Sequence, residues 1–349
     1  MKIQLSDHFT YQRLLHFCLP SIVMMIFTSI YGVVDGLFVS NFVGKIPFAA
    51  INLVMPFIMI LGGFGFMIGT GGSALIAKTL GEGNHKLANR YFSMLIIMTV
   101  ILGLILTTIG IVFARRVSIL LGATDVMLDD CVIYLRTVLL FISPFMLQNV
   151  FQSFLVTAQK PHAGLIVTII AGLTNMSLDA LFIVVFRWGV AGAALATGIS
   201  QCIGGLLPLI LFLGKNDSLL HLVPTRLEWR PFFLSCTNGM SELMGNISSS
   251  IVSMLYNFQL LNYAGENGIA AYGVLMYVQF IFIAVFFGYT IGVGPVIGYH
   301  YGAGNHAELK NLLRKSLKLN IITGISMTIL ANLFAGALSR IFVGYDPEL

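Results

Sequence analysis

The chain has 349 residues, of which 57% are hydrophobic and only 9% are Asp, Glu, Lys or Arg, whereas an average soluble protein has about 25% charged residues. So few charges cannot cover the surface of a soluble protein of this length, and the bilayer is therefore the expected solvent. The net charge of +5 does not indicate a nucleic-acid-binding protein, because the positive residues lie in short connections and not along a basic stripe.

Nine stretches are long and apolar enough to form transmembrane helices, each of which needs about 20 mostly apolar residues. In chain order they cover residues 17–41, 51–77, 91–113, 131–157, 163–186, 190–213, 233–262, 270–299 and 317–339. The runs are continuous and lack the period-two alternation of β-barrel strands. The sequence therefore predicts an all-α integral membrane protein with nine spans.

The distribution of Lys and Arg predicts the orientation of these spans. The N-terminus and the even-numbered connections carry thirteen of these residues, and the opposite side carries five. Because cytoplasmic loops are enriched in Lys and Arg, we expect a multi-pass protein of the cell membrane with its N-terminus in the cytoplasm. The four cysteines lie far apart and form no C-x-x-C pair, so buried thiols are expected and not a zinc site or a disulfide framework.

An internal repeat appears when the chain is shifted by 221 residues without a gap. The segment 44–85 then has 12 identities in 42 positions, and Gly81-Glu-Gly-Asn-His85 falls on Gly302-Ala-Gly-Asn-His306. The shift spans six helices, an even number, so the two copies point the same way across the membrane as a parallel repeat. In each copy the Gly residues permit a tight turn and the Asn can cap the helix that follows.

The repeat predicts the domain organisation. Residues 1–214 form a complete N-terminal six-helix lobe, residues 215–232 form a cytoplasmic linker, and residues 233–349 form part of a C-terminal lobe, helices 7 to 9. The second copy stops after the equivalent of three helices, so we expect three further helices in a complete two-lobe protein. A natural nine-helix protein is the alternative.

Polar residues at membrane depth are candidates for a cation site, because a carboxylate near the centre of the bilayer costs about 2.5–3.5 kcal/mol on insertion scales. Asp35 lies deep in the first span, with Tyr31 one turn before it. Asn175 and Asp179 lie four residues apart and share one face of the fifth span, and the hydroxyl of Thr197 in the sixth span could join them. The alternatives are an acid at the outer interface for Asp35 and an interhelical hydrogen-bond cluster without an ion for Asp179.

The seventh span carries a polar stripe at steps of three and four residues, formed by Glu242, Asn246, Ser249, Ser253 and Asn257. A polar stripe is unfavourable against lipid, so the pattern favours a water-filled cavity that could bind substrate. A polar seam against a neighbouring helix is the alternative. The chain has no Walker motif, no H-E-x-x-H sequence and no spaced Cys/His set, so no enzyme activity and no cofactor are expected.

The chain resembles the multidrug and toxic compound extrusion (MATE) family, and its acids resemble the DinF-like branch. The resemblance rests on the strings Leu19-Pro20, Asp35-Gly-Leu-Phe-Val39, Gly81-Glu-Gly-Asn84, Asn175-Met-Ser-Leu-Asp179-Ala-Leu-Phe-Ile183 and Gly189-Val-Ala-Gly-Ala-Ala194. It implies two six-helix lobes that exchange H+ or Na+ for organic cations. It further implies that Asp35 and Asp179 bind the cation, with Asn175 and Thr197 as further oxygen ligands, a possible Na+ site, and with Tyr31 in the cavity.

The functional hypothesis is therefore a cation-coupled multidrug efflux antiporter that exports small organic cations by alternating access. The expected partners are those cations and the bilayer, without nucleic acid, and the protein is expected to be a monomer. Glu242, Asn246 and Asn257 are assigned to the substrate cavity from the polar stripe alone. Two alternatives remain: a lipid-linked oligosaccharide flippase with a similar repeat architecture, and a transport-inactive truncated fragment.

Overall fold

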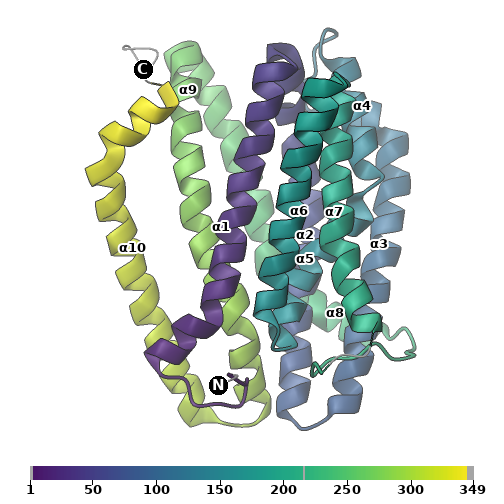
Figure 1. Cartoon of the computed structure of the whole chain (residues 1–349), viewed down its shortest axis with the longest axis vertical. Coiled ribbons are helices and arrows are strands. Elements are labelled where there is room, and N and C mark those ends of the chain that lie inside the picture. The colour runs from purple at the N-terminus through teal and green to yellow at the C-terminus, as the bar shows by residue number, and fades with distance from the viewer. Residues whose placement is uncertain (1–2, 215–216, 344–349) are drawn as a thin grey trace.

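The computed structural model of the chain describes residues 3–214 and 217–343, without the side chains of residue 45, of much of 254–278 and of 334–343. The helices are Tyr11–Phe42 (α1), Lys45–Gly81 (α2), His85–Leu120 (α3), Leu128–Leu139 (α4), Ile142–Thr157 (α5), Pro161–Asp179 (α6), the π-helix Ala180–Val185 (η1), Gly189–Leu213 (α7), Trp229–Asn238 (α8), Met240–Gly302 (α9) and His306–Val343 (α10). Most of the long helices run side by side along the long axis of the molecule (Figure 1).

The all-helical architecture predicted from the sequence is confirmed, and the described residues contain no strand. Seven helices in the described part are long and apolar enough to cross a bilayer, and there are eight if the bent pair α4–α5 is one span. The chain is thus a multi-pass membrane protein. The exact number of nine spans stays a prediction, because the side chains of much of 254–278 lie outside the description.

The predicted fourth span is broken into two helices. α4 and α5 meet at Leu140 and Phe141 with a bend of 56°, so the single helix expected over 131–157 is wrong in detail. A bend frees backbone carbonyl groups, which must find other partners inside a membrane. The hydroxyl of Thr107 in α3 donates a hydrogen bond of 2.9 Å to the carbonyl of Leu139 and so satisfies one of them.

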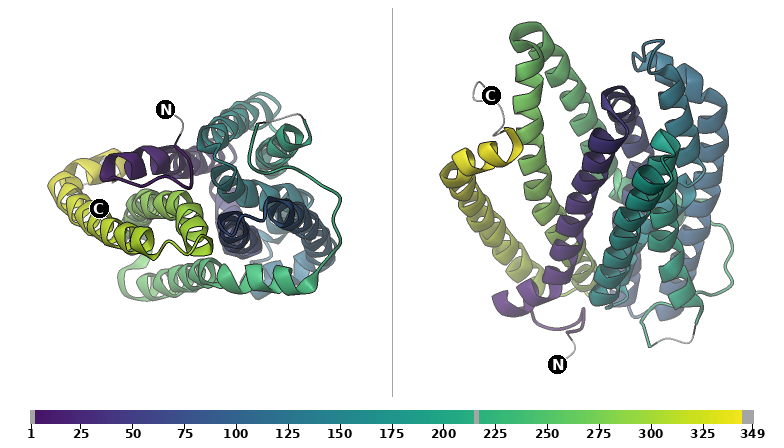
Figure 2. Two further views of the ribbon diagram at one scale, coloured as in Figure 1. Left: turned by 90° about the horizontal axis from the view of Figure 1, so that it is seen from below. Right: turned by 45° about the horizontal axis from the view of Figure 1, so that its top comes forward.

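α9 contains the eighth predicted span and most of the seventh in one helix that folds back on itself, whereas residues 233–238 of the seventh predicted span belong to the separate helix α8. Glu242 near its start and Pro295 near its end line the same cavity, although a straight helix would separate them by about 80 Å. Figure 2 shows the two arms of α9 side by side and joined at the upper end. The second arm of α9, which ends at Gly302, and α10 lie on the side of the molecule opposite α3 and α4 (Figure 1).

The two Gly-x-Gly-Asn-His turns adopt the same conformation, as the repeat predicts. Gly83 and Gly304 both have positive φ, 80° and 66°, which glycine adopts without strain. The Asn84 side chain accepts a hydrogen bond of 3.1 Å from the backbone N–H of Leu87 at the start of α3. Asn305 accepts one of the same length from the N–H of Glu308 in α10. Both asparagines therefore cap the next helix, as predicted.

Close glycine contacts between the two halves obey the same 221-residue relation. A Cβ atom placed on Gly81 would lie 2.0 Å from the carbonyl oxygen of Tyr299, and one on Gly302 would lie 1.9 Å from that of Lys78. Tyr299 is the repeat equivalent of Lys78, so the contact is reciprocal. Reciprocal contacts of this kind are the signature of a two-fold relation between two similar bodies, and they support the parallel repeat.

α5 is the central helix of the first six predicted spans. Of its 16 residues, 14 are buried, and it packs against α2, α3, α6 and α7. The ring of Phe92 in α3 contacts the rings of Phe154 in α5 (tilted, centroids 5.5 Å apart) and of Phe212 in α7 (edge to face, 4.9 Å). Because nearly all of α5 is buried, its polar side chains point at neighbouring helices or into the cavities between them.

The non-helical segment before α8 lies along the start of α3. The backbone N–H of His221 donates to the Asn89 side chain (3.0 Å), and the N–H of Val223 donates to the Ser93 hydroxyl (2.9 Å). Arg90 and Glu228 form a salt bridge of 3.0 Å at the end of the segment. These contacts fix the described part of the segment against the first six predicted spans.

Candidate functional site

The predicted carboxylates of α1 and α6 lie together in the interior. Asp35 is 8% exposed and Asp179 is 0% exposed, and the two side chains interact with each other. Gly172 permits this approach, since a Cβ atom there would lie 2.9 Å from the Tyr31 ring. The carboxyl group of Asp35 is therefore buried between helices, and the alternative that it lies at the level of the outer interface is not tested by this burial.

Asn175 lies one turn before Asp179 on the same face of α6 and is 1% exposed. Directly after Asp179 the helix widens into η1, a π-helix of six residues. Such segments inside α-helices occur frequently at functional sites, because they change the direction of nearby side chains. The structure thus places the Asn175–Asp179 pair at an irregular point of the helix.

Thr197 lies on α7, which packs against both α5 and α6. Its hydroxyl oxygen is buried and has no hydrogen-bond partner. Thr197, Gln201 and Gly204 share one face of α7, and a Cβ atom on Gly204 would lie 2.5 Å from the Gln148 side chain of α5. Thr197 therefore faces the interior of the helix group, as the prediction requires.

Three further residues of this site were not predicted from the sequence. Tyr134 of α4 is 1% exposed and interacts electrostatically with both carboxyl groups. The Gln148 side chain of α5 interacts with Tyr31, and Gln201 lies one turn from Thr197. The only signal in the sequence was the spacing of four residues between polar side chains, as in Gln148 and Gln152, within otherwise apolar runs.

Buried oxygen atoms without a hydrogen-bond partner concentrate on α1 and α6, which carry the two carboxylates, and on α5 and α7, which pack against α6. Among the described side chains, most such atoms belong to the following residues: Asp35, Gln148, Gln152, Asn175, Asp179, Thr197 and Gln201. We call this group the carboxylate cluster. Native proteins rarely leave buried polar atoms unpaired, and carboxylate, amide and hydroxyl oxygens are the ligands that hard cations prefer. The oxygen donors therefore fit a Na+ ion, and the carboxyl groups also fit a proton.

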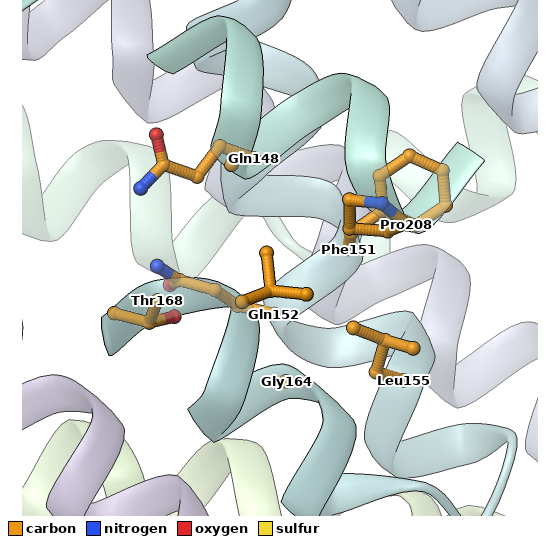
Figure 3. A pocket seen from close by; sticks show the side chains of 9 residues that line it. Gln148, Phe151, Gln152, Leu155, Gly164, Thr168 and Pro208 are labelled. Atoms are coloured by element: carbon orange, nitrogen blue, oxygen red, sulfur yellow. The ribbon is translucent and has the colours of Figure 1, made fainter. Parts of the chain in front are cut away.

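A small cavity continues the cluster between α5, α6 and α7. Its volume is about 10 Å³, close to the minimum for one water molecule. Gln148, Gln152 and Thr168 supply its polar lining, and Figure 3 shows the two glutamine amides on the same side of α5. The interior of the first six predicted spans thus holds a polar column in an apolar surrounding.

A second, larger cavity of about 220 Å³ lies between α2, α5, α8 and both arms of α9. Glu242 lines it, and the binding of substrate in this cavity stays a prediction. Asn246 does not line it: its side chain donates a hydrogen bond of 2.8 Å to the Glu242 carbonyl and packs against Gly63 of α2. The polar stripe is therefore a cavity wall at Glu242 and a seam between helices at Asn246.

Two other predicted cavity residues have different outcomes. The side chain of Asn257 lies outside the described residues. Tyr31 interacts with Gln148 and Asp35 of the carboxylate cluster and lines neither of the two cavities. The structure therefore separates the predicted site into two places, the carboxylate cluster and the Glu242 cavity.

Known proteins are similar in sequence to this chain over most of its length. Among curated relatives, the multidrug export protein MepA of Staphylococcus haemolyticus is 27% identical over 345 residues, which are 97% of this chain and 75% of the relative. MepA of Staphylococcus saprophyticus is 28% identical over 309 residues, which are 87% of this chain and 67% of the relative.

Solved structures share the fold. A MATE protein in complex with MaL6 superposes with a TM-score of 0.91 at 21% identity, over 98% of this chain and 76% of that chain. An outward-facing multidrug resistance MATE family transporter of the MOP superfamily has a TM-score of 0.89 at 21% identity, over 96% of this chain and 75% of that chain.

The family model MatE matches residues 20–181 and 243–349. The first matched segment includes Asp35 and Asp179, and the two segments together make up more than half of the chain. The chain therefore belongs to the multidrug and toxic compound extrusion (MATE) family.

Proposed function

We propose that the chain acts as a multidrug efflux transporter that exchanges H+ or Na+ for small organic cations by alternating access. The relatives named as multidrug export proteins support the transport of organic compounds. The observation that supports the cation coupling is the buried pair Asp35–Asp179, together with unpaired buried oxygens on α6 itself and on two further helices, α5 and α7. Carboxylates at this depth are costly, and membrane proteins that contain them commonly use them to bind ions.

In the proposed mechanism, the carboxylate cluster takes up the inward-moving cation from outside. Cation binding stabilises one packing of α1 against α6, and release of the cation stabilises another. The organic cation binds the two packings with different affinity, and this difference in affinity couples the two movements. We assign residues 1–214 and 233–349 to the two lobes that move, with 215–232 as linker. The proposed protein is a monomer of the cell membrane with a cytoplasmic N-terminus.

The first test is Asp35→Asn and Asp179→Asn in vesicles that contain the full chain. The neutral amides cannot exchange a proton or compensate the charge of Na+, so each variant should lose at least about tenfold of gradient-driven organic-cation transport, equivalent to about 1.4 kcal/mol. Transport is measured as uptake of a fluorescent organic cation after an H+ or Na+ gradient is imposed. Membrane content is measured in parallel, and unchanged transport would remove the carboxylates from the mechanism.

The flippase alternative is less well supported by the described residues. A carrier of lipid-linked pyrophosphate is expected to line its path with Arg or Lys. Arg136 is the basic residue that the sequence places within a span, and the structure exposes its side chain on the outside of α4. The inactive-fragment alternative is tested by comparing the chain with a version extended by three helices, since only the longer protein would then transport.

A further inference from the structure

The N-terminal segment, residues 3–10, crosses to the second half of the repeat and lies against the start of α10. The backbone N–H of Phe9 donates a hydrogen bond of 3.0 Å to the Glu308 carboxylate, and the Phe9 carbonyl accepts one of 3.3 Å from Asn311. Nδ1 of His8 lies 2.5 Å from the other oxygen of the same carboxylate. The segment therefore ties the start of α1 to α10, at the end of the molecule that carries both Gly-x-Gly-Asn-His turns (Figure 1).

Apolar side chains also hold this segment in place. Leu5 and Phe9 are both 0% exposed. The Phe9 ring contacts Phe17 of α1 and His300 of α9, with ring centroids 5.9 and 6.5 Å apart. Release of the segment would expose both apolar side chains to water, which is unfavourable. The segment thus joins three helices, α1, α9 and α10, by burial as well as by hydrogen bonds.

Glu308 binds the segment with both of its carboxylate oxygens. It lies in the first turn of α10 and is 5% exposed, and a buried carboxylate needs hydrogen-bond partners. Its repeat equivalent in α3 is Leu87, although α3 begins with the same asparagine cap as α10. The carboxylate is therefore not required to start the helix, and besides the bond from Asn311 within α10 its hydrogen bonds come from His8 and Phe9 of the segment.

The linker before α8 repeats this arrangement with the two halves exchanged. A shift of 221 places the N-terminal segment on residues 224–231. There the Thr225 hydroxyl donates to the Arg90 carbonyl (3.2 Å), and Glu228 forms the salt bridge with Arg90. Arg90 is the equivalent of Asn311. Each segment thus precedes the first helix of one half and binds the third helix of the other half, so the two segments together oppose separation of the halves at this end.

We propose that residues 3–10 form a strap that must leave α10 before the molecule opens at the end with the two turns, and that Glu308 is the anchor of this strap. The inference rests on the proposed alternating access and adds a device that sets how much of the protein is closed on this side. Opening at this end moves α10 away from α1, and the strap connects these two helices. Contacts of the strap with Glu308 therefore stabilise the closed arrangement.

Two introduced cysteines report the two events separately. Leu5→Cys lies in the strap at a site that is 0% exposed, and Ser73→Cys lies in α2 at a site that is 3% exposed. A membrane-impermeant maleimide is added to inside-out vesicles that contain the full chain, without a gradient or a substrate. Each reaction rate is corrected for that of the chain without an introduced cysteine. The first rate measures release of the strap, and the second measures opening between the halves.

Glu308→Leu introduces the side chain found at the equivalent position of α3. It should raise the reaction rate of Leu5→Cys at least about fivefold and that of Ser73→Cys at least about threefold, because the hydrogen bonds that hold the strap are lost. Glu308→Gln keeps an oxygen acceptor for Phe9 and should have a smaller effect on both rates. Asp7→Asn is the matched control: its side chain is bonded to Gln4 within the strap, and both rates should stay within about 1.5-fold.

Deletion of residues 3–9 distinguishes release of the strap from a general loss of stability. The deletion leaves Thr10, which caps α1, and should raise the rate of Ser73→Cys as much as Glu308→Leu does. In the shortened chain Glu308→Leu should have no further effect, because both changes remove the same interaction.

Three outcomes would overturn the inference. These are an unchanged rate of Leu5→Cys in Glu308→Leu, a released strap with an unchanged rate of Ser73→Cys, and an equal effect of Glu308→Leu in the full and the shortened chain. None of them would bear on the proposed antiport, which is tested by gradient-driven transport in the Asp35 and Asp179 variants.

Discussion

At the scale of single residues, the carboxylate cluster combines groups that oppose folding. Asp179 is fully buried and neither of its oxygens has a hydrogen-bond partner, while Asp35 lies beside it. An unsatisfied buried polar group costs about 1–3 kcal/mol, and more if it is charged. Functional sites often keep such destabilising polar groups because the groups are required for function. The pair should therefore lower stability in the absence of a bound cation.

This reasoning predicts the effect of Asp179→Asn on stability. The amide is neutral and can donate a hydrogen bond to the Asp35 carboxylate, so the free energy of unfolding should rise by about 1 kcal/mol. The melting temperature of the purified chain at neutral pH should then rise by about 2–4 °C. Asn175→Asp, which adds a charge to the same helix face, serves as the opposite control and should lower it. A lower melting temperature for Asp179→Asn would show that the carboxylate stabilises the fold.

At the scale of helices, the two halves approach each other at their glycines. Gly71 of α2 lies against the Ser235 carbonyl and the Gly239 nitrogen, and Gly292 of α9 lies against Cys18 of α1. Gly292 and Gly71 are repeat equivalents, as are Gly239 and Cys18. Small residues allow close backbone contact between transmembrane helices. Alternating access would have to break these contacts to open the molecule on this side.

A methyl group at such a contact should separate the helices. Gly81→Ala would place a Cβ atom 2.0 Å from the Tyr299 carbonyl oxygen, and overpacking of this kind costs about 1–3 kcal/mol. We expect the packed arrangement to be depopulated, so that a cysteine introduced by Ser73→Cys, at a site that is 3% exposed, reacts several-fold faster with a thiol reagent in inside-out vesicles. Gly302→Ala should have a similar effect, because its contact is the reciprocal one.

The control for this experiment is Gly245→Ala. Gly245 lies in α9, and a Cβ atom there would meet no other atom within 4 Å. This variant should leave the reaction rate of the introduced cysteine unchanged. An equal rate in Gly81→Ala would mean that α2 and α9 accommodate the methyl group without separating.

At the scale of the whole molecule, the orientation in the membrane decides which end would take up the coupling ion in the proposed mechanism. The excess of Lys and Arg predicts that the N-terminus and the two Gly-x-Gly-Asn-His turns are cytoplasmic. The connection between α3 and α4, which contains Asp125, would then be extracellular. The repeat requires both turns to lie on the same side, because equivalent helices in a parallel repeat point the same way.

Cysteine labelling in intact cells tests this orientation. Asp125→Cys should react with a membrane-impermeant maleimide added outside, and Lys86→Cys, next to the first turn, should react only after the membrane is permeabilised. Both positions are exposed, whereas Cys18, Cys131 and Cys236 are buried and Cys202 is partly buried, so background labelling should be low. Labelling of Lys86→Cys from outside would reverse the assignment.

The amino-acid sequence by itself determined the class of fold, the repeat and the central acids. Long apolar runs can only be satisfied as helices in a bilayer, since every backbone polar group must pair within its own segment. The 221-residue relation follows from residue identities alone, and the structure repeats it in the caps of Asn84 and Asn305. Asp35 and Asp179 were identifiable because a charged side chain within an apolar run is costly in a bilayer and is therefore expected to have a function.

Tertiary structure alone decided which polar groups share a site. Tyr134, which interacts with Asp35 and Asp179, and Gln148, which interacts with Tyr31, come from other helices. The rotation of each helix about its axis is set by packing and not by its own sequence. The same limit explains why Glu242 and Asn246, one turn apart, end in different surroundings: α2 reaches Asn246 through Gly63 but leaves a cavity beside Glu242. Periodicity fixes which residues share a face, and only the neighbouring helices decide what that face meets.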